Sequence, residues 1–259
     1  MTVFTRGILA WALLGGVVST SFVPRSRGAE PLKLHPENPH YVVFRGKPTV
    51  LVASTEHYGA VLNRDFDYIR YLDELKAHGF NLTRTFSGTY FEVPGSFGIV
   101  DNTLAPARGR YLGPWARSDQ GGAGDGGNRF DLTKFDPDYF ARLEDFVTLA
   151  GKRGIVVELV LFCTIYDDKL WHVSPLRAGN NVNGIGKVAR DQVYSLKDKA
   201  LTAVQDALVR KFVTELKDCD NVYYEVCNEP YFGGVTKEWN DHIIATLTAA
   251  EDGIRDRSM

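Results

Sequence analysis

The segment that most constrains the fold is the near-continuous apolar run IVVELVLF at residues 155–162. Strands buried on both faces have such runs, whereas strands with one solvated face alternate apolar and polar residues. Gly154 precedes the run and closes an amphipathic segment that begins at Asp136-Pro137, a capping carboxylate followed by proline at the first helical position. A helix that leads through a short turn into a doubly buried strand is typical of a parallel sheet with helical crossovers.

The same order of strand and helix recurs four times. Long connections follow the second and third strands, at 87–135 and 163–197, while the connections from helix back to strand are short. A hairpin of 40–44 and 49–54 precedes the repeats, and its second arm leads into the first buried strand. Strands are predicted at 49–54, 80–86, 155–162 and 221–227, and helices at about 64–78, 136–154, 199–217 and from Thr236 nearly to the end.

This pattern predicts an α/β chain that forms about the first four βα units of a (β/α)8 TIM barrel, with its ligand contacts on the two long loops. A doubly wound sheet would also fit the alternation, but the turn at 53–60 lacks the glycine-rich pattern for a nucleotide. The GGAGDGG stretch at 121–127 lacks the Lys-Ser/Thr ending of a phosphate loop, so that interpretation is rejected.

The first 29 residues are predicted to be an export signal. Arg6 gives a basic start, and the apolar run at 7–18 is shorter than the roughly 20 residues that a membrane span needs. We therefore expect a secreted or periplasmic protein in which residues 30–259 form the N-terminal part of one catalytic domain. No later stretch is long and apolar enough to cross a bilayer.

Composition excludes several classes of partner. The net charge of −2 gives no electrostatic case for nucleic acid or for an anionic membrane. The three cysteines, Cys163, Cys219 and Cys227, are odd in number and are expected to be free thiols, largely buried. Because no CxxC or His/Cys pair has zinc spacing, we expect no metal and no cofactor.

The segment YYEVCNEP at 223–230 carries the chemistry. It places Asn228-Glu229-Pro230 at the carboxyl end of the fourth buried strand. Cleaving a glycosidic bond requires a carboxylic acid that protonates the leaving oxygen. The motif and its strand resemble the acid/base signature of the large clan of retaining glycoside hydrolases that includes cellulases and mannanases. The resemblance implies that Glu229 is the general acid/base and that Asn228 bonds the 2-hydroxyl group of the sugar.

Arg84, at the end of the second strand, is similar to the arginine that holds the nucleophilic carboxylate in relatives with this fold. From His35 to the end, the chain resembles the N-terminal part of bacterial cellulase-like proteins of glycoside hydrolase family 5. Further substrate contacts are expected at His57 after the first strand, at Tyr166, Trp171 and His172 after the third, and at Tyr231 beside Glu229. Packing or solvated roles remain open for the first four of these residues.

The second carboxylate is the open question. The resemblance implies a nucleophile at the end of a seventh strand, and only 30 residues (259 minus 229) follow Glu229. We therefore expect a fragment that is inactive alone and that could self-associate through uncovered sheet edges. Recruitment of Glu56 or Asp167 as the second carboxylate is disfavoured.

The sequence leaves two alternatives to a retaining glycoside hydrolase. The first is a non-catalytic half-barrel, or an inactive truncated product, that binds carbohydrate through its aromatic loops. The second is a metal-dependent hydrolase, which is disfavoured because no strand end shows a His-x-His pair or an Asp/His cluster.

Overall fold

The computed structural model describes residues 30–54 and 57–258, so the predicted export signal lies outside the described residues. The chain folds around a parallel sheet with strand order β4-β7-β8, formed by β4 (Leu82–Phe86), β7 (Val156–Cys163) and β8 (Val222–Asn228). The predicted α/β class with parallel strands is therefore confirmed.

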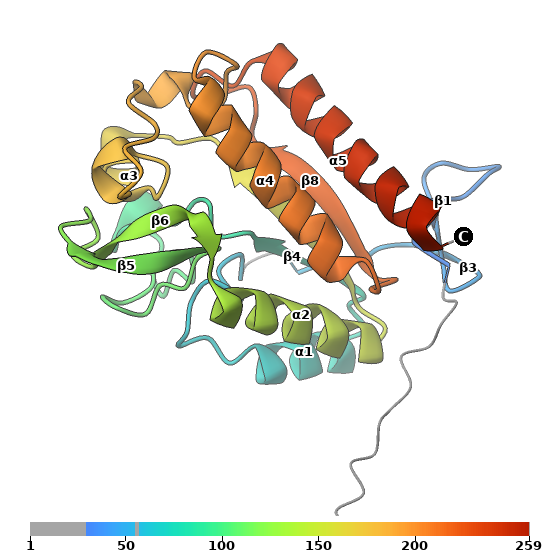
Figure 1. The fold of residues 1–259 in the computed structure, drawn as a ribbon. Helices are drawn as coiled ribbons and strands as arrows, with labels where there is room; N and C mark the ends of the chain where they lie inside the picture. Colours follow the sequence, from blue (N-terminus) through green and yellow to red (C-terminus); the bar gives the residue numbers. More distant parts are fainter. Residues whose placement is uncertain (1–29, 55–56, 259) are drawn as a thin grey trace, which may run out of the picture.

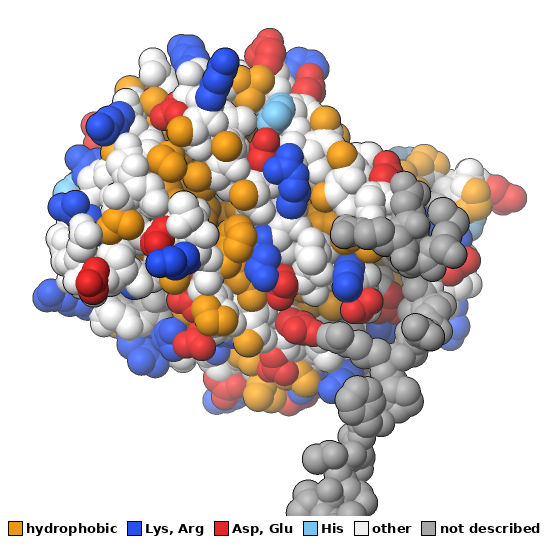
Figure 2. Space-filling model, in the orientation of Figure 1, with side chains coloured by type: hydrophobic (Ala, Val, Ile, Leu, Met, Phe, Trp, Pro, Cys, Tyr) orange, Lys and Arg blue, Asp and Glu red, His pale blue; other side chains and the backbone are white. Residues whose placement is uncertain are grey.

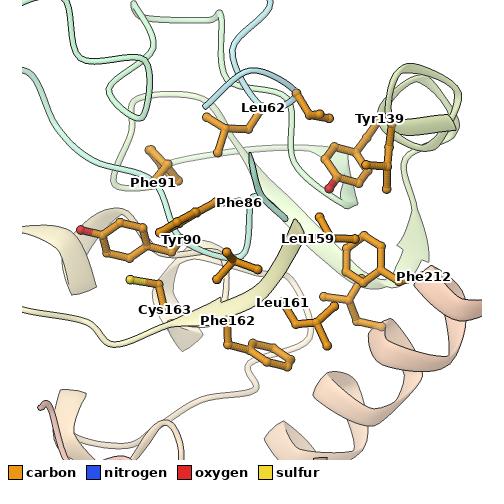
Figure 3. Close-up of a cluster of buried hydrophobic side chains, with 14 of the residues drawn as sticks. Leu62, Phe86, Tyr90, Phe91, Tyr139, Leu159, Leu161, Phe162, Cys163 and Phe212 are labelled. Carbon is orange, nitrogen blue, oxygen red and sulfur yellow. The ribbon is translucent and has the colours of Figure 1, made fainter. Parts of the chain in front are cut away.

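Four helices accompany these strands. They are α1 (Tyr68–Ala77), α2 (Pro137–Lys152), α4 (Lys199–Leu216) and α5 (Lys237–Ser258). Figure 1 shows α1 beside α2 and α4 beside α5 in front of the strands. The main hydrophobic core lies between the helices and the sheet, where Figure 3 shows Leu159 and Leu161 of β7 near Phe212 of α4.

The first predicted strand, at 49–54, does not form a regular strand, and that prediction is wrong. A hairpin does form, from β2 (Val42–Phe44) and β3 (Lys47–Thr49) with the short β1 (Lys33–Leu34) alongside, but its second arm ends at Thr49, where the predicted arm begins. Beyond it, Ala53 forms only an isolated parallel bridge to Leu82. This segment lies at the edge of the sheet, where the Asn81 side chain bonds the backbone of Val50 and Val52 in place of a continuous ladder.

Local capping explains where the helices begin. Asp136 accepts hydrogen bonds from the first backbone amides of α2, as predicted, and the Thr236 hydroxyl accepts one from Trp239 at the start of α5. Helix α1 begins four residues later than predicted, because Asp67 caps it by accepting from the amide of Arg70. Asn63, just before the predicted start, accepts from the amide of Asp65 within the preceding turn and does not cap the helix.

The two long loops contain ordered elements that the sequence did not predict. The first contains the antiparallel hairpin of β5 (Trp115–Gly121) and β6 (Asn128–Phe135), with GGAGDGG at its turn. The second contains the short helix α3 (Asp168–Val173). Figure 1 shows β5, β6 and α3 gathered at one end of the helices and β1 and β3 near the other, so the long loops cover the carboxyl end of the sheet.

The surface of the molecule carries charges of both signs. Figure 2 shows basic and acidic side chains interspersed over the helix-covered face. Of the helices in the described part of the chain, none is long and apolar enough to span a membrane. Cys163 and Cys227 are buried free thiols, as the sequence predicted.

Candidate active site

Glu229 follows the last residue of β8 and occupies a strained backbone position. Its φ angle is +49°, in the left-handed region that costs a residue with a side chain about 1–3 kcal/mol. The carboxylate accepts hydrogen bonds from the hydroxyls of Tyr166, at 2.5 Å, and Tyr231, at 3.1 Å. The strained turn therefore aims Glu229 away from the strand and toward two phenol donors.

Asn228 joins Glu229 to the neighbouring strands. Its Oδ1 atom accepts from Nη2 of Arg84 at 2.8 Å, and its Nδ2 atom donates to the Tyr166 hydroxyl at 2.9 Å. The Tyr166 hydroxyl therefore accepts from Asn228 while it donates to Glu229. Burial, with Cys163 and Glu229 nearby, raises the pKa of Tyr166 above its ordinary value, so its hydroxyl keeps its proton at working pH.

Arg84 sits between two carboxylates of the same sheet face. Its Nε donates to Glu225 at 2.9 Å, its Nη2 also contacts Glu225, and its Nε lies 3.8 Å from a Glu158 oxygen. Burial alone would lower the pKa of Arg84, but the hydrogen bond that Arg84 donates to Glu225 and the charges of Glu225 and Glu158 raise it. Arg84 is thus a fixed cation whose anionic partners come from β7 and β8.

Glu158, the β7 carboxylate near Arg84, has a raised pKa. Burial raises its pKa above the ordinary 4.5, and the proximity of Glu225 adds to the shift, while the charge of Arg84 opposes it. The structure places Glu158 within β7, where it pairs with Arg84 of β4 and Tyr223 of β8.

Glu158→Gln should change how stability depends on pH. A carboxyl group whose pKa is raised on folding stabilises the folded protein at any pH below the pKa that the group has in the unfolded chain. This contribution is lost as the pH rises through the raised pKa of the folded state. The variant lacks this titrating group and does not lose that stability. The urea midpoint of the variant, relative to that of the wild-type protein, should therefore rise as the pH increases from about 4.5 toward neutrality. Parallel midpoint curves for the two proteins would show that Glu158 does not titrate abnormally.

Arg84, Asn228 and Glu229 line one pocket at the carboxyl end of the sheet. The pocket has a volume of about 280 Å³, and its polar lining is Arg84, Glu92, Asn228 and Glu229. The rest is mainly aromatic: Tyr58, Phe86, Tyr90, Phe97 and Tyr166. Figure 3 shows two of the rings, Phe86 and Tyr90, close to Cys163, which also lines the pocket. A mixed apolar and carboxylate lining of this kind suits a sugar.

Sequence reasoning missed Tyr58, Glu92 and Phe97. Glu92 is 6% exposed and accepts from the Tyr90 hydroxyl at 2.9 Å and from the Asn102 amide. Glu92 and Phe97 lie inside the first long loop, where no strand end or motif singles out a residue. Tyr58 stacks on Phe86 at 5.1 Å, and only the tertiary fold brings these two rings together.

Three predicted contacts lie elsewhere in the structure. The His57 ring packs on Phe66 and Tyr71, with centroid distances of 5.0 and 5.1 Å. Trp171 and His172, on α3, line a separate pocket of about 420 Å³. Asp167 caps α3 by accepting from the amide of Leu170, and Glu56 lies outside the described residues. In the described parts of the chain, no three His, Cys, Asp or Glu side chains group so as to hold a metal ion.

Comparison with known protein families gives one match, over residues 106–246, which is just over half of the chain. The matching family is described as a domain of unknown function, DUF6298. The chain belongs to this family. The part of the chain that matches DUF6298 contains Tyr166, Asn228 and Glu229, whereas Tyr58 and Arg84 precede it. A search of curated proteins finds no match to the chain.

Solved structures similar to this DUF6298 member include glycoside hydrolases. A candidate glycoside hydrolase from Bacteroides vulgatus has a TM-score of 0.57 at 17% identity, over 86% of this chain and 37% of that one. An endo-1,4-β-mannanase from Rhizomucor miehei has a TM-score of 0.54 at 12% identity, over 87% of this chain and 58% of its own. A family 5 mannosidase from the same organism has a TM-score of 0.55 at 10% identity, over 86% and 54%.

These similarities concern the fold. The chain has the fold of part of a glycoside hydrolase family 5 TIM-barrel protein, and it spans between about a third and three fifths of the length of these neighbours. The pocket around Glu229 lies at the carboxyl end of the parallel strands, the end at which TIM-barrel enzymes place their active sites.

Proposed function

We propose that the protein is a retaining glycoside hydrolase in which Glu229 is the general acid/base. The observation that carries the proposal is the position of Glu229 at the carboxyl end of β8, in an aromatic pocket, with its carboxylate held by Tyr166 and Tyr231. A strained residue at the end of a strand is a position at which folds commonly place function.

The reaction proceeds in two steps in this proposal. Glu229, as the acid, gives its proton to the glycosidic oxygen while the bond from that oxygen to the anomeric carbon breaks, and a nucleophilic carboxylate bonds that carbon. Glu229, now the carboxylate, then takes a proton from water while the water oxygen displaces the ester. The resemblance to glycoside hydrolase family 5 implies that this nucleophile is a glutamate at the end of a seventh strand.

The neighbours of Glu229 have supporting roles. Arg84 fixes the Asn228 side chain through Oδ1, so the Asn228 amide faces the pocket in one orientation. One Asn228 N–H is used by Tyr166, and the other points to the sulfur of Cys163 at 3.5 Å, a weak acceptor that a sugar hydroxyl can replace. Asn228 is therefore placed to bond a sugar hydroxyl beside the reacting carbon.

Tyr166→Phe should lower kcat about tenfold to a hundredfold, because a hydrogen bond to a charged group is worth about 1.5–3 kcal/mol. Tyr231→Phe should lower it less, since Tyr231 is exposed to water. Rates on an oligosaccharide and the thermal midpoint of each variant provide the measurement. A Tyr166 variant with wild-type kcat and an intact fold would contradict the role of this hydroxyl.

The direct test is hydrolysis by the full-length natural protein. Because two fold neighbours are described as a mannanase and a mannosidase, soluble β-1,4-mannan is the first substrate, followed by glucomannan, xylan and carboxymethyl cellulose. New reducing ends, absent from a Glu229→Gln preparation, would support the proposal. Binding of these glycans without any cleavage would favour the alternative of a non-catalytic carbohydrate-binding protein.

A further inference from the structure

We propose that Phe97, Tyr231 and Phe232 form an aromatic platform beside Glu229 that stacks on the pyranose rings of a sugar chain. This inference rests on the proposed function and deepens it. The substrate class becomes an oligosaccharide or polysaccharide whose neighbouring rings are bound outside the pocket, in place of a small glycoside that the pocket alone could hold.

The three rings are unusually exposed for their size. Phe97 is 61% exposed, Tyr231 74% and Phe232 52%. Exposed apolar side chains scattered singly are ordinary, whereas a contiguous group marks a binding surface. These rings come from two loops more than 130 residues apart in the sequence and meet at Tyr166, so they form a contiguous group.

Ring contacts define the platform. The Phe97 ring meets Tyr166 edge-on at a centroid distance of 5.4 Å, and Phe232 approaches Tyr166 at 6.4 Å. Tyr231 lies 4.7 Å from Phe232. Tyr166 and Phe97 also line the pocket that contains Glu229, so the platform is continuous with the site of the proposed reaction.

The loop that carries Phe97 is held in shape. Phe97 has a φ angle of +56°, a left-handed conformation that is costly for a phenylalanine. The ends of the loop are joined by the Glu92 amide, which donates to the Leu104 carbonyl at 2.7 Å, and by the contact between the Glu92 carboxylate and Asn102. Thr103 then accepts from the amide of Gly59. Strain of this kind persists where the surrounding structure imposes it.

The segment after Glu229 is held equally closely. A Cβ atom on Gly233 would lie 2.2 Å from the Thr164 hydroxyl, and one on Gly234 would lie 2.0 Å from the Asp191 carbonyl. Glycines are therefore needed for the close packing of this turn, which fixes Tyr231 and Phe232. Since both parts of the platform are pre-organised, ligand binding would cost little ordering of the chain.

The chemistry of the platform favours a sugar over a protein partner. Its rings surround hydroxyls and a carboxylate, because the hydroxyls of Tyr231 and Tyr166 both donate to Glu229. A pyranose has the same combination of apolar C–H faces and a polar rim. The cores of protein–protein interfaces are instead depleted of charged residues, so a central glutamate argues against that occupant.

The test compares Phe97→Ala and Phe232→Ala with Val100→Ala in the full-length protein. Val100 is 84% exposed in the same loop, which makes it a matched control for loss of an exposed apolar side chain. Soluble glucomannan is the long probe, and the 4-nitrophenyl β-glucoside and β-mannoside are the short ones. Affinity for glucomannan is also measured by native gel retardation, which needs no turnover.

Each platform variant should raise KM for glucomannan about three- to tenfold and weaken retardation similarly. In Phe232→Ala, whose ring does not line the pocket around Glu229, the rates on the short glycosides should stay within twofold of wild type. Val100→Ala should match wild type throughout. Retardation lost in the platform variants of a protein that cleaves nothing would support the platform and contradict the proposed function. Unchanged cleavage and unchanged retardation in both Phe97→Ala and Phe232→Ala would overturn the platform but not the proposed function. A change in the oligomeric state of these variants would also overturn the platform, because it would show that a protein partner binds this surface.

Discussion

Glu229→Gln should lower kcat/KM on unactivated oligosaccharides by about a hundredfold to ten-thousandfold, the range that general acid–base catalysis contributes. The amide is close in shape to the acid, and its oxygen can still accept from one of the two tyrosine hydroxyls, but it cannot give a proton to a leaving sugar. Aryl glycosides with acidic phenol leaving groups need little protonation, so their first step should slow far less.

The leaving-group dependence separates chemistry from folding. Glu238→Gln, an exposed substitution in the first turn of α5, is the matched control and should leave all rates unchanged. Initial rates on a series of aryl glycosides of graded phenol pKa provide the measurement. Equal losses in Glu229→Gln for every leaving group would show that Glu229 supports the pocket without acting as its acid.

Arg84→Met should destabilise the protein by about 3 kcal/mol at pH 7. Removing one member of a buried ion pair costs about 3–5 kcal/mol. The lower end applies here, because the side chains of Arg84, Glu158 and Glu225 keep 16%, 19% and 24% of their exposure. Without the guanidinium, two carboxylates of β7 and β8 would face each other with no cation in contact. Urea unfolding at pH 7 measures the loss.

Two comparisons test the electrostatic origin of that loss. Near pH 4 the carboxylates can take up protons, so Arg84→Met should cost less than at pH 7. Arg110→Met removes an exposed arginine paired with Asp65 and should cost under about 1 kcal/mol at either pH. A pH-independent loss in Arg84→Met would show that the packing of the Arg84 stem, and not its charge, supports the sheet.

Much of the fold could be predicted because its signals are local. The runs at 155–162 and 221–227 became β7 and β8, and Asp136-Pro137 became the start of α2. The strand at 49–54 was wrongly predicted because an apolar run does not reveal whether a strand will have neighbours. The hairpin β5–β6 was missed because glycines and charged residues dominate its sequence. In the structure, Trp115 and Phe130 of this hairpin are buried in the core, and Arg117 pairs with Asp125.

The candidate site follows the same division. Asn228 and Glu229 stand at the carboxyl end of β8, as the motif predicts, whereas Arg84 lies in the middle of β4 and not at its end. Arg84 contacts Asn228 directly, and Tyr166 joins Asn228 to Glu229. Glu92 and Phe97 depend on the path of a loop of nearly fifty residues, which no periodicity encodes. Trp171 and His172 were expected in the same place because they follow the third strand, but α3 carries them to another pocket.

The most direct test of the central claim is azide rescue of Glu229→Ala with an aryl β-glycoside that the wild-type protein cleaves. The small anion can enter the space left by the missing carboxylate and attack the glycosyl–enzyme intermediate without base assistance. We predict faster turnover with azide and a glycosyl azide of β configuration, the same as the substrate, identified by proton NMR. An α-glycosyl azide would make Glu229 the nucleophile, and a variant whose rate neither falls nor responds to azide would contradict a catalytic role for Glu229.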